Sequence, residues 1–99
     1  RLTLQGVVQV NRVVWILDSG CSRHMTGDRA LLSNVVEKVG PVVTFGDNSK
    51  GSTQGYGNLH AGNVIIENVS VVEGLKHNLL SISQFCDKGY GVHFEKETC

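Results

Sequence analysis

The sequence predicts an all-β fold in one small domain, and three observations support this. Short runs of β-branched and apolar residues recur along the chain, separated by glycine, asparagine and aspartate. This pattern is typical of strands joined by tight turns. Helix signals are few, and residues 81–88 carry the clearest start and stop, Ser81 and Gly89. The 99 residues suit a single domain, so we expect one domain over residues 1–99.

The first expected element is a hairpin. Residues 2–4 and 7–10 are strand-like, and Asn11-Arg12 forms the expected turn. The returning run, residues 13–17 (Val-Val-Trp-Ile-Leu), is apolar throughout and predicts a buried strand.

This strand delivers Asp18 into a turn of small residues, Ser19-Gly20-Cys21-Ser22. A carboxylate at the end of a buried strand is costly to desolvate, so it needs hydrogen bonds or a partner charge. Gly20 lets the backbone turn tightly and bring its N–H groups near that carboxylate. Asp18 is therefore the candidate reactive acid, and a turn aspartate that closes a hairpin is the simpler reading.

Two elements are expected in the middle of the chain. Residues 28–33 predict a short helix capped by Asp28. Residues 42–45 predict a strand, Gly46-Asp47-Asn48-Ser49 a tight turn, and residues 52–58 the returning strand.

The last third predicts strands and the helix. Residues 63–72 supply one or two strands, with Ile65, Val69 and Val71 expected in the core. Ser81 is the expected N-cap of the helix over residues 81–88, and residues 90–96 alternate as a final strand. An unpaired terminal strand can pair with another chain, which favours dimerisation.

Charge and composition narrow the function classes. Lys plus Arg and Asp plus Glu number nine each, which argues against nucleic acid as the main partner. The sequence contains no apolar run of about 18 residues or more, so no membrane span is expected. No secretory leader is expected either. Arg1 at the start predicts a processed product or a piece of a longer chain. Three cysteines do not suggest a disulfide framework and favour a reducing, intracellular setting.

Cys21 and His24 leave two other chemistries open. Their Cys-x-x-His spacing allows a zinc site, which would need two more ligands, and the remaining His and Cys residues are scattered. A Cys-His protease lacks further support in the sequence. His24 could also be a base or a satisfied polar residue.

Two stretches resemble a known family. The pattern apolar-apolar-Asp-Ser-Gly-small-Ser resembles the active-site loop of retropepsin-type aspartic proteases. The longer string from Trp15 to Asp28 is similar to the protease of Ty1/copia-type retrotransposon polyproteins. Residues 75–88 are similar to the same proteases. The resemblance implies a retropepsin-like closed β-barrel that forms a two-fold homodimer. It also implies a flap hairpin at about residues 42–57 and places Leu79-Leu80 beneath the active-site loop.

The resemblance implies an aspartic endopeptidase. Asp18 and its symmetry mate would activate a water, because the sequence holds a single Asp-Ser-Gly and this chemistry needs two carboxylates. Ser19 would bond the partner's backbone, and Gly20 the substrate backbone. Phe45, Gly46, Asp47 and Asn48 would form the substrate-binding part of the flap.

The implied substrate is the chain's own Gag-Pol polyprotein, in the cytoplasm, within virus-like particles. No cofactor, metal, nucleic acid or membrane partner is implied. The alternative is a catalytically silent, domesticated dimer of the same fold that binds peptide without cutting it.

Overall fold

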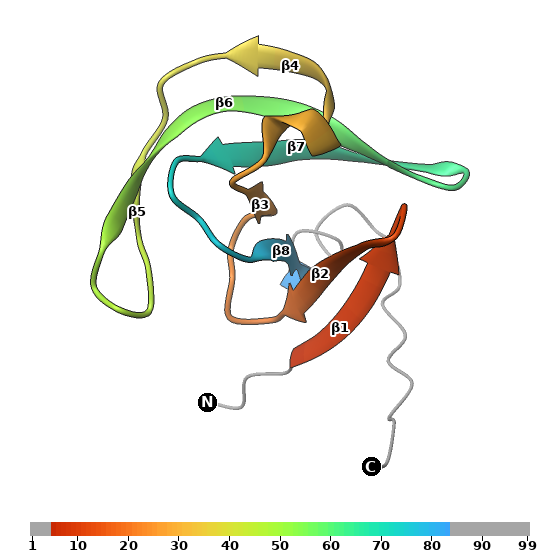
Figure 1. Cartoon of the computed structure of the whole chain (residues 1–99), viewed down its shortest axis with the longest axis horizontal. Coiled ribbons are helices and arrows are strands. Elements are labelled where there is room, and N and C mark those ends of the chain that lie inside the picture. The colour runs from red at the N-terminus through yellow and green to blue at the C-terminus, as the bar shows by residue number, and fades with distance from the viewer. Residues whose placement is uncertain (1–4, 84–99) are drawn as a thin grey trace.

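A computed structural model describes residues 5–83 of the chain. It is all-β, as predicted (Figure 1). The elements in order are β1 (Gln5–Val10), β2 (Val13–Asp18), β3 (Met25–Thr26), the 3-10 helix η1 (Arg29–Leu31), β4 (Ser33–Glu37), β5 (Val42–Thr44), β6 (Lys50–Ala61), β7 (Val64–Val72) and β8 (Asn78–Ser81). None of the described helices is long and apolar enough to cross a membrane.

The predicted first hairpin is present. β1 and β2 pair antiparallel from Val10↔Val13 at the turn to Gln5↔Asp18 at the open end. Asn11 and Arg12 both have positive φ, 52° and 68°, as the two-residue turns that match the strand twist require. The Asn11 side-chain amide donates to the His60 carbonyl at 2.7 Å, which ties this turn to β6.

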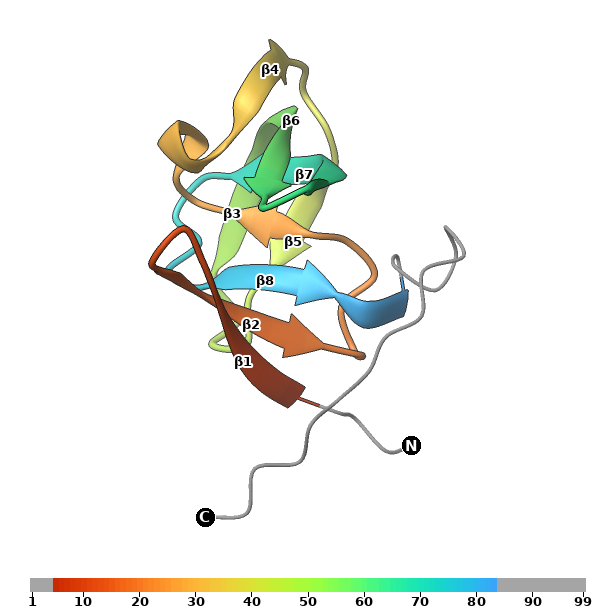
Figure 2. The same ribbon diagram turned by 90° about the vertical axis from the view of Figure 1, so that its right-hand side faces the viewer.

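Strands from the two ends of the described chain alternate in the sheet. β8 runs parallel to β2, with Leu17 opposite Leu80 and Asp18 opposite Ser81. On the side of β8 away from β2, β3 pairs antiparallel with β8. β3 in turn pairs parallel with β7. The strand order is therefore β1-β2-β8-β3-β7-β6-β4, and the loop of residues 19–24 crosses over the end of β8 (Figure 2).

β6 and β7 form the longest pairing and arch over the rest of the molecule (Figure 1). Val69 and Val71 are buried as predicted, but Ile65 is 50% exposed and Ile66 takes the core position. Asn68 has φ 59°, and the register of β6 and β7 shifts between Gly57 and Leu59. Such an irregularity moves the in-and-out alternation by one residue.

The core lies between the β1–β2–β8 part of the sheet and the β6–β7 pair. It contains fully buried Trp15 from β2 and Leu80 from β8, against Leu59 from β6 and Val69 from β7. Burying an aromatic of this size contributes roughly 2–3 kcal/mol. The strand that carries Asp18 is thus anchored by its own Trp15.

The sheet is open. β1 and β4 stand at the two ends of the strand order, and no pairing joins them among the described residues. The closed barrel expected from the resemblance is therefore not formed by residues 5–83. The terminal strands expected at residues 2–4 and 90–96 lie outside the described residues.

Two helices were expected. The one after Asp28 is confirmed in a shorter form, since the Asp28 carboxylate accepts from the Ala30 N–H at 3.0 Å and caps the 3-10 helix η1. Arg29 in this helix forms an ion pair with Glu37 of β4. The helix expected over residues 81–88 lies mostly outside the described residues, and Ser81, its expected N-cap, is the last residue of β8.

Candidate active site

Asp18 is the last residue of β2 and is half-buried. In the sheet it lies between Gln5 of β1 and Ser81 of β8, its two register partners. The position follows from the sequence, because the apolar run from Val13 to Leu17 is held in the sheet and Asp18 ends it. The backbone then leaves the sheet as the loop of residues 19–24, which we call the acid loop.

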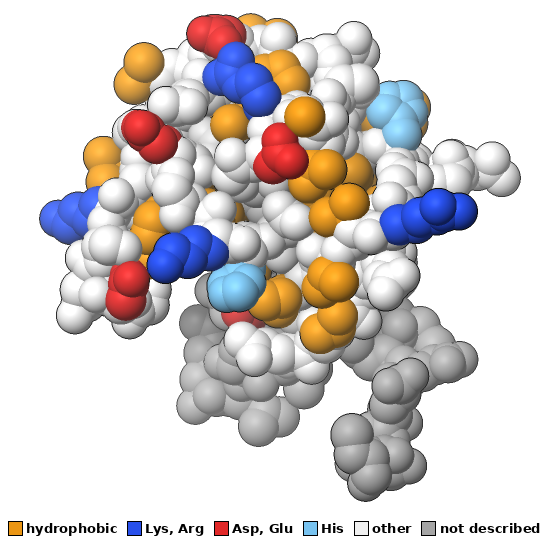
Figure 3. All heavy atoms as spheres, in the orientation of Figure 1, with side chains coloured by type: hydrophobic (Ala, Val, Ile, Leu, Met, Phe, Trp, Pro, Cys, Tyr) orange, Lys and Arg blue, Asp and Glu red, His pale blue; other side chains and the backbone are white. Residues whose placement is uncertain are grey.

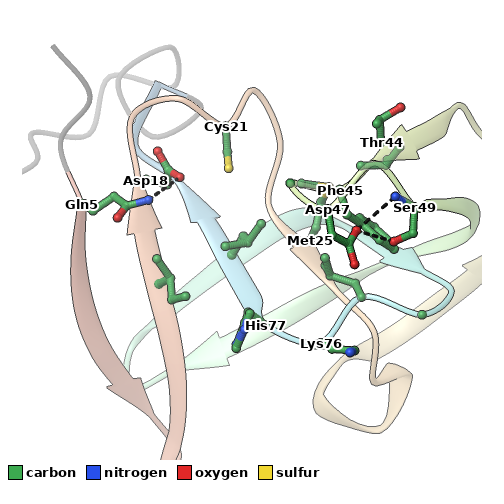
Figure 4. Close-up of a pocket in the computed structure, with 16 residues that line it drawn as sticks. Gln5, Asp18, Cys21, Met25, Thr44, Phe45, Asp47, Ser49, Lys76 and His77 are labelled. Carbon is green, nitrogen blue, oxygen red and sulfur yellow. Dashed lines mark hydrogen bonds between the residues drawn. The ribbon is translucent and has the colours of Figure 1, made fainter.

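Two donors fix the orientation of the Asp18 carboxylate. The Gly20 N–H donates to Oδ1 at 2.7 Å, as the sequence predicts for a glycine in this turn. The Gln5 side-chain amide donates to Oδ2 at 3.2 Å (Figure 4). Sequence reasoning missed Gln5, because only the register of β1 on β2 brings it opposite Asp18.

The far side of the acid loop is held by β8. The Ser81 hydroxyl donates to the Cys21 carbonyl at 2.6 Å, and the Ser81 N–H donates to His24 Nδ1 at 2.9 Å. His24 is 2% exposed and Ser81 is fully buried. Because Nδ1 accepts a hydrogen bond, the neutral His24 ring carries its proton on Nε2. Of the roles left open for His24, the structure therefore supports the satisfied polar residue.

Cys21 faces the Asp18 carboxylate from the acid loop (Figure 4). Burial, the Asp18 charge and a hydrogen bond to that carboxylate raise the pKa of the Cys21 thiol to about 11. A thiol with this pKa is a poor nucleophile at neutral pH. Within residues 5–83 no three His, Cys, Asp or Glu side chains are grouped so that they could hold a metal ion.

A cleft of about 530 Å³ opens beside Asp18. Ile16, Met25 and Leu79 line it from the sheet. Val43 and Phe45 line it from the hairpin of β5 and β6. The space-filling view shows the surface hollowed beside this hairpin (Figure 3). The volume falls within the range of small-molecule and peptide sites. Lys76 adds a positive charge and His77 an imidazole ring at its edge (Figure 4).

The turn between β5 and β6, residues 45–49, covers this cleft; we call it the hairpin turn. The Phe45 N–H donates to the Ser49 carbonyl at 2.8 Å, and the Asn48 N–H donates to the Phe45 carbonyl at 3.0 Å. The Asp47 carboxylate accepts from the Ser49 N–H at 3.0 Å and from its hydroxyl at 2.5 Å. These bonds lower the pKa of the exposed Asp47 carboxyl. Asn48 takes the left-handed conformation, with φ 69°.

The structure brings most of the candidate residues together. Asp18, Phe45, Gly46 and Asp47 line the same cleft. Ser19, which is half-buried, and Gly20 stand in the acid loop next to it. Asn48 belongs to the hairpin turn but does not line the cleft. Leu80 is buried in the core and Leu79 lines the cleft, so the apolar pair lies beside the strand of Asp18.

Comparison with known proteins supports a transposon origin. The family described as "Pol polyprotein, beta-barrel domain" matches residues 15–90. The chain belongs to this Pol polyprotein β-barrel family. The Pol domain is also 32% identical, over 68 residues, to a transposon Ty5-1 protein of Saccharomyces cerevisiae.

The match to the Ty5-1 protein covers 69% of this chain and 47% of that protein, so the Pol domain spans about half the length of its relative. No solved structure matches the chain. The family and this relative together assign the chain to the Pol region of a retrotransposon.

Proposed function

We propose that this Pol domain is half of an aspartic endopeptidase. The observation that carries the proposal is the Asp18 carboxylate, which is oriented by the Gly20 N–H at 2.7 Å and opens on the 530 Å³ cleft under the hairpin turn. A carboxylate that is fixed in orientation and open to a peptide-sized cleft is the arrangement that acid–base hydrolysis requires.

The second carboxylate comes from a second copy of the chain in this proposal. The sequence holds one Asp-Ser-Gly, whereas two acids that share one proton are needed, about 3 Å apart. A two-fold dimer with both Asp18 side chains at its axis supplies them. Among residues 5–83 the open sheet ends at β1, whose Gln5 contacts Asp18, and we propose that a partner meets the protomer at this edge.

The chemistry follows from the pair. One Asp18 carboxylate removes a proton from a water, and the water oxygen bonds to the scissile carbonyl carbon. The protonated Asp18 of the other subunit donates its proton to the carbonyl oxygen. The tetrahedral intermediate then collapses and the C–N bond breaks. The amine leaves with the proton that the first carboxylate took up, and one hydroxyl of the intermediate returns its proton to the second carboxylate as the C=O bond re-forms. A bell-shaped pH profile of activity is expected, because one acid must be ionised while the other is protonated.

The cleft fits an extended polypeptide. Its walls are mainly apolar, so main-chain hydrogen bonds and apolar pockets would together bind a strand-like substrate. The hairpin turn would close over that substrate and exclude water. We propose that the substrate is the polyprotein that contains the domain, processed in the cytoplasm within virus-like particles.

The decisive experiment compares a longer precursor with its Asp18→Asn variant. Neutral Asn is nearly isosteric and can still accept from the Gly20 N–H, so the fold should persist while cleavage is lost. Fragments read by mass spectrometry should form only with Asp18. Equal fragment yields from both precursors would contradict the proposal, and peptide binding without cleavage by the unmodified protein would favour the silent binding module.

A mixing experiment tests the shared site. The unmodified protein is mixed with an equal amount of the Asp18→Asn variant until the subunits have exchanged. Only dimers with two Asp18 residues should cleave. Activity should then fall to roughly half of that given by the same amount of Asp18 protein alone. Unchanged activity after complete exchange would show that one chain holds a complete site. The control partner is an Arg12→Gln variant, changed at the distant hairpin turn of β1 and β2; because it keeps Asp18, adding an equal amount of it should raise the activity about twofold.

A further inference from the structure

A second cavity, of about 390 Å³, lies on the other side of the acid loop. Its lining residues are Ser22, Arg23, Lys38, Tyr56, Asn68 and Ser70, so all six are polar, two are cationic and none is acidic. Arg23 and Lys38 form no ion pair among residues 5–83, where the single ion pair joins Arg29 to Glu37. Two unpaired cations that share a cavity of this size favour an anion between them.

The floor of this cavity holds an unused hydrogen-bonding group. Ser70 is 1% exposed, and its hydroxyl has no hydrogen-bond partner among the described residues. A buried polar group without a partner costs free energy that a ligand can recover. Ser70 is the register partner of Tyr56 on β6, which places a second hydroxyl-bearing side chain on the same part of the sheet.

Four segments converge on this cavity and fix its shape: the acid loop, the segment after β4, β6 and β7. The Ser70 N–H donates to the His24 carbonyl at 2.9 Å, which joins β7 to the end of the acid loop next to Arg23. The Lys38 N–H donates to the Gln54 carbonyl at 3.0 Å, which holds the segment after β4 against β6. The two cations are therefore carried by backbone that is tied to the sheet.

We propose that this cavity binds a carboxylate, namely the side chain of a glutamate or aspartate in the polypeptide that occupies the neighbouring cleft. The inference rests on the proposed function for the identity of the ligand. Cys21 lines the first cavity and Ser22, the next residue, lines the second. An extended peptide advances about 3.3 Å per residue, so a chain that passes Asp18 reaches the second cavity within a few residues.

Arg23 and Lys38 are thus specificity-determining residues. They would accept an acidic side chain at one position of the substrate, and the Ser70 hydroxyl would donate to its inner oxygen. Charge-assisted hydrogen bonds of this kind are the stronger ones in proteins. The same geometry would take the oxygens of a phosphate, so the test includes phosphate as a separate arm.

The test uses the full chain with Asp18→Asn, so that peptides are bound but not cut. The probes are end-capped peptides of one sequence in which a single Glu, or Gln as its matched control, is moved along the positions. We expect one position at which Glu binds about tenfold more tightly than Gln. Binding of that peptide should shift the backbone N–H resonances of Arg23 and Ser70.

Variants then assign the preference. Arg23→Gln and Lys38→Gln should each reduce the Glu advantage by roughly threefold or more, and the double variant should remove it. Arg12→Gln removes a cation outside the cavity and should leave the advantage unchanged. A Glu advantage that survives in the double variant, or no advantage at any position, would overturn the proposal.

Two further arms separate other ligands. Inorganic phosphate that competes with the Glu peptide but not with the Gln peptide would support the shared oxyanion chemistry. Phosphate that binds without affecting either peptide, or a single-stranded oligonucleotide that binds at Arg23 and Ser70 more tightly than the Glu peptide, would overturn the assignment to a polypeptide.

Cleavage of the same peptides by the Asp18 protein distinguishes the two proposals. Cleavage without a Glu preference would leave the endopeptidase in place and overturn the carboxylate site. A Glu preference in binding, without any Asp18-dependent cleavage, would support the carboxylate site and contradict the endopeptidase.

Discussion

The acid loop and the hairpin turn border one cleft, but they are held in opposite ways. The acid loop is bonded to residues far away in the chain, through His24 and Cys21 to Ser81 and through Asp18 to Gln5. The hydrogen bonds given for the hairpin turn join its own residues, from Phe45 to Ser49. His24 and Ser81 are buried, whereas Gly46, Asp47, Asn48 and Ser49 are exposed.

The difference matches the two tasks that the proposed function assigns to these regions. A catalytic carboxylate must be held within a fraction of an ångström, and long-range bonds from two strands provide this. A cover over the cleft must move without unfolding the domain, and a turn with internal bonds can move as a unit. Substitutions in the two regions should therefore differ in their cost to the fold.

The largest loss of stability is expected for His24→Ala. The change leaves a cavity in the buried site and removes the acceptor of the Ser81 N–H, which together cost about 3 kcal/mol. Urea denaturation measures this loss. The control is His60→Ala, since His60 is exposed and contacts the Ser33 hydroxyl at 2.8 Å. Equal midpoints for the two variants would contradict the anchoring role of His24.

A large kinetic effect is expected at Cys21. Its pKa rises from 9.0 to about 11 in the folded protein, so at pH 8 the thiolate fraction falls about a hundredfold. Iodoacetamide should therefore modify Cys21 about a hundredfold more slowly in the native protein than in urea, as followed by peptide mass mapping. Because the folded pKa is the higher one, this thiol contributes stability below pH 9 that is lost as the pH rises toward 11. Equal rates in both states would refute the shielding.

The smallest effect is expected for Asp47→Ala in the hairpin turn. Asp47 is fully exposed and its bonds to Ser49 are local, so the urea midpoint at neutral pH should not change measurably. Hydrogen exchange at the Ser49 N–H should become faster, and Asp47→Asn, which keeps an acceptor, should restore protection. A midpoint shift as large as that of His24→Ala would show that the turn supports the whole fold.

The same Asp47 bonds carry a pH dependence. The folded carboxyl has a pKa below its ordinary value. Its contribution to the turn is therefore present above the unfolded pKa and lost as the pH falls through the folded pKa. Exchange at Ser49 should accelerate at that lower pH in the unmodified protein and should show no such step in Asp47→Asn.

Local patterns in the sequence predicted the hairpins well. The turn at Asn11-Arg12, the buried strand that ends at Asp18 and the hairpin across residues 45–49 all follow from residues close together in the chain. The Gly20 bond to Asp18 and the Asp28 cap were also predicted. In each case a short range of residues contains both the group and its partner.

Interactions across the chain could not be predicted in this way. Ser81 was expected only as a helix cap. It does directly precede two helical residues, 82 and 83, but it also ends a parallel strand whose partner, β2, is more than sixty residues away. Four-residue strands carry too little periodicity to reveal such pairing. Ile66 is buried in place of the expected Ile65 because of an irregularity in β7 at Asn68. The sequence pattern did not predict this irregularity. The contact of Gln5 with Asp18 likewise depends on the register of β1 on β2. The cavity at Ser70 depends on the register of β6 on β7.

The alternation of β2, β8, β3 and β7 has a consequence for timing. The acid loop lacks its anchor until Ser81 has been synthesised and β8 has inserted between β2 and β3. Pairings between distant segments form slowly, because a long stretch of chain must first be closed into a loop. Asp18 and the acid loop would thus reach their final geometry only after the residues through Ser81 had left the ribosome.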